Sequence, residues 1–415
     1  GRDVIGWASF MAIGAEADAP GPAPVGPDDL ATIRYTSGTT GTPKGVPFTH
    51  AQLRWMAETM TSLVPWRART RPARHLSFLP MSHVVEGILG TYSAYDLPAP
   101  VEITFLEDFR RVAATLPAVR PTVFFSVPRL YEKLWEGLGR SRIGGRYLRM
   151  RSGPLRRLLG PVVRHAVLRR AGLNSCSQLL VGSAPIDDQL LRNFRELGVE
   201  IHAAYGLTEA PLVALNRLGR NRIGTVGELL PETRIRTADD GELLIRGPQV
   251  TDGYVDVDED EQPVHDRWLS TGDLGHVTAD GRLVIDGRKK DLLKTAYGKY
   301  LQPSKIEAML RRIPGVGEAM VVGEGRPFCA ALLWVDEDVD AGSVVAAIAE
   351  VNRRLSHPEQ VKRWAVLPDN LSIADGDLTA NLKLKRQHAE LRFRGAIEAL
   401  YAEQPTHAAA AVVST

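Results

Sequence analysis

Residues 35–46 read Tyr-Thr-Ser-Gly-Thr-Thr-Gly-Thr-Pro-Lys-Gly-Val. Glycines and small hydroxyl residues alternate in this run, ahead of a single lysine, Lys44. Because glycine tolerates positive φ and presents a bare N–H group, such a run can curve closely around an anion. The hydroxyl groups add hydrogen-bond donors, and the lysine adds a compact positive charge. The run predicts a loop that cradles a polyphosphate; the alternative is a solvated turn between two strands.

The order of these residues argues against a Walker A loop. That loop places Ser or Thr directly after Gly-Lys, whereas Gly45 follows Lys44 here. The run instead resembles the phosphate loop of the adenylate-forming (ANL) superfamily, which includes acyl-CoA synthetases, luciferase-like enzymes and nonribosomal adenylation domains. The resemblance implies that ATP is bound by Thr36, Ser37, Gly38, Thr39, Thr40, Gly41 and Lys44.

Length and composition are those of an ordinary globular enzyme. The 415 residues predict two or three domains, and the chain is 44% hydrophobic and 24% charged. A formal net charge of +2 argues against a dedicated nucleic-acid-binding protein. The two cysteines, Cys176 and Cys329, do not have the spacing of a metal site. The sequence contains no run of eighteen apolar residues, so it predicts no membrane span. We expect a cytoplasmic enzyme that acts on small molecules, with its oligomeric state open.

The first half of the chain alternates short apolar segments with helical patterns. Strand-like segments lie at 30–36, 100–105, 121–127 and 178–182, and helical stretches at 129–138 and 187–198. Strands that alternate with helices predict a parallel α/β sheet.

The pattern changes between residues 222 and 288, where Asp-Gly turn signals recur and predict antiparallel hairpins. After residue 290 we expect a small α+β unit, with a helix from about Pro303 and strands at 318–323 and 328–335. The fold class is therefore α/β: a large N-terminal domain of α/β sheets plus a β-rich subdomain, followed by a small α+β C-terminal domain. We place the domains at 1–288 and 289–400, with a disordered tail at 401–415.

Further motifs of the adenylate-forming family follow in the family's order. Residues 79–87 resemble its second core motif, which implies that His83 borders the acyl site as a gate or catalytic residue. A lone histidine is more often structural. Residues 180–187 resemble the Gly-Ala-Pro segment, where the backbone of a strand-to-helix turn lines the adenine and acyl pockets; this assigns Gly182, Ala184 and Pro185 to the nucleotide.

The most specific of these motifs is Tyr-Gly-Leu-Thr-Glu at 205–209. By resemblance, Tyr205 and Gly206 pack against adenine, Thr208 contacts phosphate, and Glu209 helps to hold Mg²⁺. A carboxylate is a hard oxygen ligand of the kind that Mg²⁺ takes alongside substrate phosphates. The alternative is a Thr-x-Glu cap at the start of a helix, which is compatible with the functional assignment.

Residues 270–275 and 287–291 resemble the ribose-binding and hinge motifs. The resemblance implies that Asp273 accepts hydrogen bonds from both ribose hydroxyls and that Arg288 reaches ribose and phosphate. Lys290 occupies the hinge position, about which the small domain rotates.

The last two motifs take their long-chain form. Residues 294–307 resemble the loop of long-chain acyl-CoA synthetases, with Tyr297 and Gly298 on the CoA path. Many shorter-chain relatives have glycine where this chain has Tyr297. Residues 378–386 resemble the final core motif, and its Lys-x-x-Arg spacing makes Lys383 the catalytic lysine. A cation there can stabilise the charge that develops when a carboxylate attacks the α-phosphate.

Together the motifs resemble a long-chain fatty acid–CoA ligase from about residue 28 to 395. The resemblance implies ATP, Mg²⁺ and CoA as cofactor and co-substrates, and an N-terminal half-domain that would precede Gly1. Two alternatives stay open: an acyl-AMP ligase that loads a carrier protein, and a non-catalytic protein that binds nucleotide or acyl-adenylate.

One stretch stands apart by its charge. No acidic residue occurs between Glu136 and Asp187, while ten arginines fall between residues 140 and 170, interleaved with leucine and valine. A basic amphipathic helix can lie on an anionic membrane surface. The alternative is a solvated basic face, which we favour because Pro154 and Pro161 are expected to interrupt a long helix.

Overall fold

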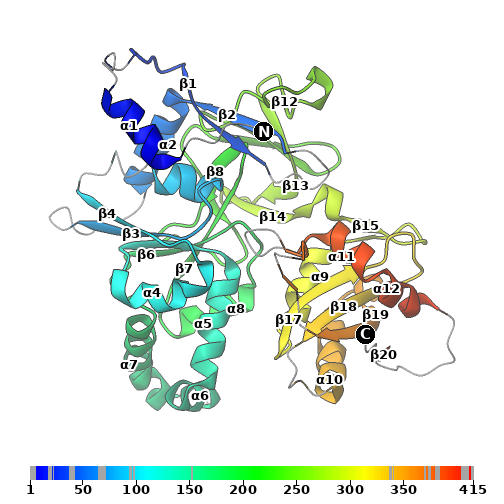
Figure 1. Cartoon of the computed structure of the whole chain (residues 1–415). Helices are drawn as coiled ribbons and strands as arrows, with labels where there is room; N and C mark the ends of the chain where they lie inside the picture. Colours follow the sequence, from blue (N-terminus) through cyan, green and yellow to red (C-terminus); the bar gives the residue numbers. More distant parts are fainter. Residues whose placement is uncertain are drawn as a thin grey trace.

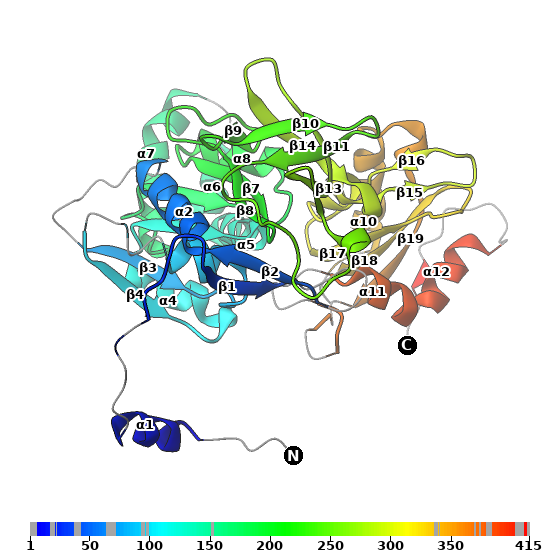
Figure 2. The same cartoon turned by 90° about the horizontal axis from the view of Figure 1, so that it is seen from above.

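The computed structural model describes residues 1–415 except 1–5, 17–20, 22, 37–42, 64–71, 93–95, 97–98, 151–152, 336–338, 340, 369–370, 373–374, 379–383, 403–410 and 413–415. A larger lobe holds β1 to β14, and a smaller lobe holds α9 to α12 with β17 to β20 (Figure 1). Helix α1 (Trp7–Glu16) lies away from the body of the molecule (Figure 2). The expected α/β class, with a large sheet-containing lobe followed by a smaller one, is confirmed.

The larger lobe is built first from parallel strands. β5 (Val123–Ser126), β6 (Gln178–Val181) and β7 (Ile201–Leu207) pair in parallel, as do β3 (Ala73–Ser77) and β4 (Val101–Phe105). The core beside them includes Phe124, Leu179 and Ile201, all buried. The helices that contribute to this core include α4 (Val112–Val119), α5 (Pro128–Arg140) and α8 (Asp188–Glu196).

The same sheet then becomes antiparallel at a hairpin. β7 turns directly into β8 (Ala210–Leu215), and the strand order across the sheet is β10-β11-β13-β14-β9-β8-β7-β6-β5. The antiparallel strands are β9 (Gly227–Leu229), β10 (Arg234–Thr237), β11 (Glu242–Arg246), β12 (Val264–His265), β13 (Trp268–Val277) and β14 (Arg282–Arg288). Gly241 and Gly281 have positive φ at two of the expected Asp-Gly turns.

A separate hairpin carries the ends of the predicted phosphate loop. β1 (Leu30–Tyr35) pairs with β2 (Gly45–Thr49), and α2 (His50–Leu63) packs on them through Phe48, Leu53 and Met56. The short π-helix η1 (Val85–Gly90) contributes Ile88 to the same cluster.

The smaller lobe is a four-stranded sheet with helices on both faces. β17 (Val316–Val322) runs antiparallel to β18 (Cys329–Val335), and β18 runs parallel to β19 (Val361–Pro368). Every residue of β18 is buried, as expected for a strand covered on both faces. The two cores around it are formed with α9 (Pro303–Leu310) and α10 (Ala341–Asn352), and with α11 (Arg386–Arg392) and α12 (Arg394–Tyr401).

The remaining short elements connect or edge these sheets. They are β15 (Leu293–Lys294), β16 (Tyr300–Leu301), β20 (Ala411–Val412), η2 (Phe109–Arg111), η3 (Glu259–Glu261), η4 (Lys289–Asp291) and η5 (His357–Glu359). Of the predicted tail 401–415, the structure describes residues 401, 402, 411 and 412, and β20 pairs with β19.

The arginine-rich stretch forms two helices, α6 (Arg142–Arg149) and α7 (Pro154–Arg170). Our expectation that Pro154 and Pro161 interrupt a long helix holds at Pro154, where a new helix begins, and is wrong at Pro161. Pro154 begins α7, where the N–H that it lacks would have no partner within the helix. Pro161 lies inside α7, and the helix continues to Arg170. Within the residues described, no helix is long and apolar enough to cross a membrane.

Candidate active site

The two ends of the predicted phosphate loop are held together. The Thr36 amide donates to the Lys44 carbonyl at 2.9 Å, and the Lys44 amide donates to Thr36 Oγ1 at 3.3 Å. Next to them, a Cβ on Gly45 would come 2.5 Å from Val255 Cγ2, so glycine is required. The predicted phosphate ligands between these ends, Ser37, Gly38, Thr39, Thr40 and Gly41, lie outside the described residues.

Lys44 faces an acidic turn. Its Nζ lies 2.7 Å from Glu261 Oε2 and 5.3 Å from the centre of the Tyr254 ring. The Lys44 ammonium lowers the pKa of the Glu261 carboxyl by hydrogen bonding and charge. A cavity of about 370 Å³ opens here, lined by Tyr35, Pro43, Lys44, Gly45, Val255, Asp256, Val257, Asp258 and Glu261. In this state the Glu261 carboxylate pairs with Lys44, the cation that the sequence predicts to bind phosphate.

The Tyr-Gly-Leu-Thr-Glu motif forms the β7–β8 hairpin. Leu207 pairs with Ala210, so Thr208 and Glu209 are the two turn residues. The alternative of a Thr-x-Glu helix cap is therefore wrong, because the chain folds back as a strand. Glu209 Oε1 accepts a 2.5 Å hydrogen bond from the Tyr254 hydroxyl, and its carbonyl accepts from the Thr251 amide at 2.9 Å.

A second cluster lies on the same hairpin, at Tyr205. The Tyr205 hydroxyl donates to Asp273 Oδ2 at 2.6 Å, and Arg288 Nε lies 2.9 Å from Asp273 Oδ1. Asp273 and Arg288 are register partners on β13 and β14, which places their side chains side by side. Burial, then the Asp273 charge, raises the pKa of Tyr205 well above its usual value. Burial lowers the pKa of the Arg288 guanidinium, but the charges of Asp273, Asp291 and Tyr205 and the hydrogen bond to Asp273 together outweigh it and raise that pKa.

The Gly-Ser-Ala-Pro turn connects β6 to α8, as expected. A Cβ on Gly182 would lie 3.0 Å from the Ala204 carbonyl oxygen and 3.1 Å from the Phe125 ring, so the turn packs tightly on β7. Ser183 has φ of 66° and its hydroxyl lies 3.4 Å from His83 Nε2. The structure thus brings His83 to the turn that carries Gly182, Ala184 and Pro185.

Among the described residues of the smaller lobe, those predicted to act at the site, Lys290, Tyr297 and Gly298, do not contact these clusters. Lys290 lies in η4, directly after β14, and Tyr297 and Gly298 are exposed at the tip of the β15–β16 hairpin. Gly298 has φ of 73°, which a larger residue adopts only with strain. Lys383 lies outside the described residues.

The ends of the segment that carries Lys383 are nevertheless well anchored. Leu378 and Leu384 form a bridge, and the Lys385 amide donates to the Asp377 carbonyl at 2.7 Å. Arg386 donates to the Val321 carbonyl at 2.7 Å and pairs with the buried Glu307.

Sequence reasoning missed three residues that complete these clusters: Tyr254, Glu261 and Asp377. Tyr254 contacts Glu209, Glu261 contacts Lys44, and Asp377 pairs with Arg392 beside the segment of Lys383. Only Tyr254 carried a signal, since it follows the Asp252-Gly253 turn.

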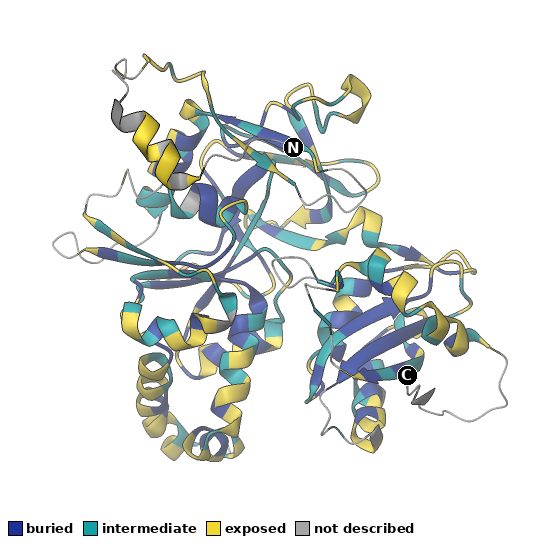
Figure 3. Ribbon diagram, in the orientation of Figure 1, coloured by how far each residue is buried: buried dark blue, intermediate teal, exposed yellow. Residues whose placement is uncertain are grey.

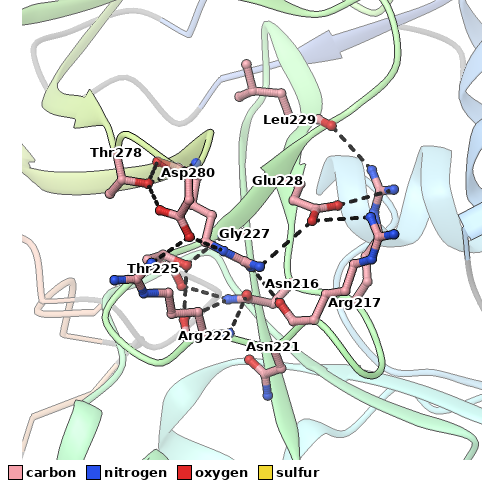
Figure 4. A network of polar contacts seen from close by, with 12 residues as sticks. Asn216, Arg217, Asn221, Arg222, Thr225, Gly227, Glu228, Leu229, Thr278 and Asp280 are labelled. Carbon is pink, nitrogen blue, oxygen red and sulfur yellow. Dashed lines mark hydrogen bonds and ion pairs between the residues drawn. The ribbon is translucent and has the colours of Figure 1, made fainter.

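A further polar network ties the β8–β9 connection to the β13–β14 turn (Figure 4). Asn216 donates to the Thr225 carbonyl at 2.7 Å, and Arg222 Nη1 lies 2.5 Å from Asp280 Oδ2. Hydrogen bonds, first from the Thr278 hydroxyl, lower the pKa of Asp280 to about 2. Glu228 pairs with Arg217, Arg220 and Arg282. These contacts hold β9 between β8, which follows the turn that carries Glu209, and β14, which ends at Arg288.

Two family models match this chain, one in each lobe. The family model described as "AMP-binding enzyme" matches residues 6–255, and that described as "AMP-binding enzyme C-terminal domain" matches residues 290–405. The chain is 34% identical over 432 residues to a Mycobacterium tuberculosis protein named as a fatty-acid–CoA ligase, fadD11; the match covers 92% of this chain and 75% of that protein. It is 32% identical over 425 residues to long-chain-fatty-acid–CoA ligase FadD15 of the same organism, covering 90% and 69%.

Solved structures show the same fold. The chain superposes with a TM-score of 0.72 on ATP-bound MatB from Rhodopseudomonas palustris, at 23% identity, covering 94% of this chain and 73% of that one. The A domain of carboxylic acid reductase from Segniliparus rugosus gives a TM-score of 0.73 at 22% identity, covering 93% and 63%. With the family models spanning both lobes and relatives above 30% identity, this chain belongs to the AMP-binding enzyme family.

Proposed function

We propose that the chain is an AMP-forming fatty acid–CoA ligase that acts on long-chain substrates. A fatty carboxylate attacks the α-phosphate of ATP to give acyl-AMP and pyrophosphate, and the CoA thiol then attacks the acyl-AMP to give acyl-CoA and AMP. The observation that carries the proposal is that both clusters involve the β7–β8 hairpin. Tyr205 of this hairpin meets Asp273, which pairs with Arg288, and Glu209 at its turn meets Tyr254. The names of the relatives above 30% identity support the substrate class.

A different set of groups holds each part of the nucleotide. The Asp273 carboxylate accepts hydrogen bonds from the ribose hydroxyls, and Arg288 turns from Asp273 toward ribose and phosphate. Lys44 and the 36–41 loop hold the outer phosphates once Lys44 leaves Glu261. Gly182, Ala184, Pro185, Tyr205 and Gly206 surround the adenine, and Thr208 donates to phosphate. His83, beside Ser183, borders the acyl chain.

Mg²⁺ would be held by Glu209 together with substrate phosphates. The described residues contain no group of three or more His, Cys, Asp or Glu that could hold a metal by themselves. One carboxylate with phosphate oxygens is a donor set that Mg²⁺ uses, so Glu209 at the turn fits this ion. Tyr254, which donates to Glu209 Oε1, fixes the direction of that carboxylate. When bound, the ion neutralises charge on the phosphates.

Two half-reactions require two arrangements of the smaller lobe. Lys383 stabilises the charge that develops in adenylation, and Gly298 with Tyr297 lies on the path of the CoA thiol in the second step. Rotation about Lys290 exchanges them at the site and excludes water from the acyl-AMP.

Pyrophosphate release with ATP, Mg²⁺ and carboxylates from acetate to oleate, each with and without CoA, tests the proposal. We expect turnover on long chains that depends on CoA. Lys383→Ala should lower adenylation by at least about 100-fold, the scale of losing one preorganised transition-state donor. Lys385→Ala, two residues along the same motif, is the matched control and should retain most activity.

Other outcomes select the alternatives. Adenylation that ignores CoA but loads a carrier protein would make the chain an acyl-AMP ligase. A folded chain that binds ATP but releases no pyrophosphate with any acid would contradict the proposal and favour a binding protein. Equal losses in both lysine variants would overturn the assignment of Lys383.

A further inference from the structure

Helices α6 and α7 form an arm at the end of the larger lobe, beyond the strands (Figure 1). The inner side of α7 is fastened to the body: Gly160 and Val163 are buried, Arg156 pairs with Glu196 at 3.4 Å, and Arg164 donates to the Gly198 carbonyl at 3.3 Å. Arg156 also stacks over the Tyr147 ring of α6. These contacts fix which side of the arm faces outward.

The outer side of the arm is apolar as well, and it is exposed. On α7, Leu155 is 57% exposed, Leu158 72%, Leu159 37% and Val162 65%; on α6, Ile143 is 77% exposed. The four α7 positions follow the i, i+3, i+4, i+7 spacing, so they form one stripe on the helix surface. Figure 3 colours much of α6 and α7 as exposed, and an ordinary surface helix carries polar residues on its exposed face. A continuous exposed apolar stripe of this kind marks an interaction surface.

Arginines surround this stripe without acidic neighbours. The segment from residue 137 to 186 contains no Asp or Glu. Among its described arginines between residues 140 and 170, only Arg156 forms an ion pair. The exposed arginines are Arg140, Arg142, Arg146, Arg149, Arg157, Arg164, Arg169 and Arg170. By helical periodicity Arg169 falls on the stripe's side of α7 and Arg146 falls beside Ile143 on α6, whereas Arg157 and Arg164 fall on the far side of α7. The arm therefore presents leucine and valine side chains together with guanidinium groups that no described acidic residue pairs.

We propose that this outer face of α6 and α7 docks on an anionic lipid bilayer. Guanidinium groups bind lipid phosphates through paired hydrogen bonds, and the leucine stripe enters the boundary between head groups and acyl chains. A second copy of the chain fits poorly, because a twofold contact would bring the same arginines against one another. An acidic protein surface would match the arginines but leaves the leucine stripe without a reason. This inference does not depend on the proposed reaction.

Co-sedimentation of the full chain with vesicles tests it. Vesicles of equal parts phosphatidylcholine and phosphatidylglycerol should bind the protein, pure phosphatidylcholine should bind it much less, and added salt should weaken binding to the first. Each exposed arginine contributes roughly a fivefold factor near an anionic surface. Arg146→Gln with Arg169→Gln should therefore weaken partitioning by roughly 25-fold, and Leu158→Asp should weaken it as well.

The matched control is Arg353→Gln with Arg354→Gln, at the end of α10 in the smaller lobe, which should bind as the unaltered chain does. Thermal unfolding checks that the exposed-site variants still fold. Equal binding to both kinds of vesicle, or unchanged binding of the Arg146/Arg169 variant, would refute the proposal. So would a dimer, seen by sedimentation velocity without lipid, that Leu158→Asp separates, because the face would then be a contact between copies.

Discussion

At the scale of single residues, the side chains of the candidate site are paired with one another, and a ligand would have to compete for these ion pairs and hydrogen bonds. Asp273 divides its two oxygens between Tyr205 and Arg288, and Lys44 is held by Glu261. Each contact occupies a group that the proposed reaction assigns to the nucleotide. Binding of ATP therefore exchanges internal partners for ligand atoms, and the strength of the internal partners enters the affinity.

The Lys44–Glu261 contact gives a direct prediction. Glu261→Gln removes the negative charge that competes with phosphate for Lys44, so ATP should bind more tightly. The gain should be at most about a fivefold lower Kd, because an exposed ion pair contributes little in water. Isothermal titration calorimetry measures it, with Glu259→Gln in the same turn as control. Weaker ATP binding in Glu261→Gln would show that Glu261 assists the nucleotide rather than competing with it.

The lowered pKa of the Glu86 carboxyl predicts that the stability of the fold depends on pH. Burial raises the pKa of this carboxyl, but the hydrogen bond and charge of His75, together with hydrogen bonds from Ser77 and the Leu79 amide, outweigh it and leave the pKa below its usual 4.5. His75 Nε2 lies 2.8 Å from Glu86 Oε1, and the Phe78 and Leu79 amides donate to Oε2 at 3.3 Å. A lowered folded-state pKa means that the stabilisation is complete above pH 4.5 and is lost as the pH falls through the folded-state value.

Glu86→Gln should therefore lower the free energy of unfolding by about 2–3 kcal/mol at pH 7, the value of hydrogen bonds to a charged group. The difference from the unaltered chain should shrink as the pH falls below 4.5. Urea unfolding at a series of pH values measures this. A difference that stays constant down to acid would mean that the charge of Glu86 is not what stabilises the fold.

At the scale of elements, the β7–β8 hairpin positions most of the site. It carries Tyr205 on one strand and Glu209 at its turn, and it lies where the sheet changes from parallel to antiparallel. Ligands of open α/β sheets bind beyond the carboxyl ends of the strands, and β6 and β7 both end at the site. The register of β13 with β14 then brings Asp273 to Arg288.

Gly206 makes this hairpin sensitive to a single methyl group. A Cβ there would lie 2.3 Å from the Pro211 carbonyl oxygen, and a backbone atom cannot move aside as a side chain can. Gly206→Ala should destabilise the chain by about 1–3 kcal/mol and weaken ATP binding with it. Gly137→Ala, in the exposed part of α5 with nothing within 4 Å, should instead raise stability by up to about 1 kcal/mol. Denaturant unfolding of both variants measures the contrast, and equal effects would contradict the close approach at Gly206.

At the scale of the whole molecule, an ion pair between described residues joins the two lobes beside the site. Arg312, two residues after the end of α9, pairs with Asp187, the N-cap of α8, whose carboxylate also accepts from the Gln189 and Leu190 amides. Burial and the nearby Arg354 lower the pKa of Arg312. Because Asp187 follows the Gly-Ser-Ala-Pro turn, the contact links the arrangement of the lobes to a segment of the site.

Arg312→Ala should shift the population of lobe arrangements away from this one. A partly exposed ion pair contributes up to about 1 kcal/mol, so the shift should be at most about fivefold. Faster proteolysis near Lys290 would report it, because freer rotation exposes the connecting segment. Lys305→Ala, which loses a pair with Glu359 inside the smaller lobe, is the control. Equal cleavage rates in the unaltered chain and in Arg312→Ala would contradict a role in holding the lobes.

The amino-acid sequence by itself was sufficient for the class of fold, the order of elements and the family. Strands and helices of the larger lobe begin and end near the predicted residues, because apolar periodicity and Asp-Gly turns act over a few neighbouring positions. The family motifs are also local: a phosphate loop or a strand-to-helix turn needs glycine and small residues in a short run.

Only the tertiary structure decided which side chains meet. Tyr254 with Glu209, Glu261 with Lys44, and Arg312 with Asp187 are far apart along the chain, and no local pattern relates them. The continuity of α7 through Pro161 was likewise a matter of context, since Gly160 and Val163 are buried against the body on the inner side of that turn. Short runs of sequence determine local chemistry, whereas contacts between side chains that are distant in the sequence depend on strand register and on how the sheet changes direction.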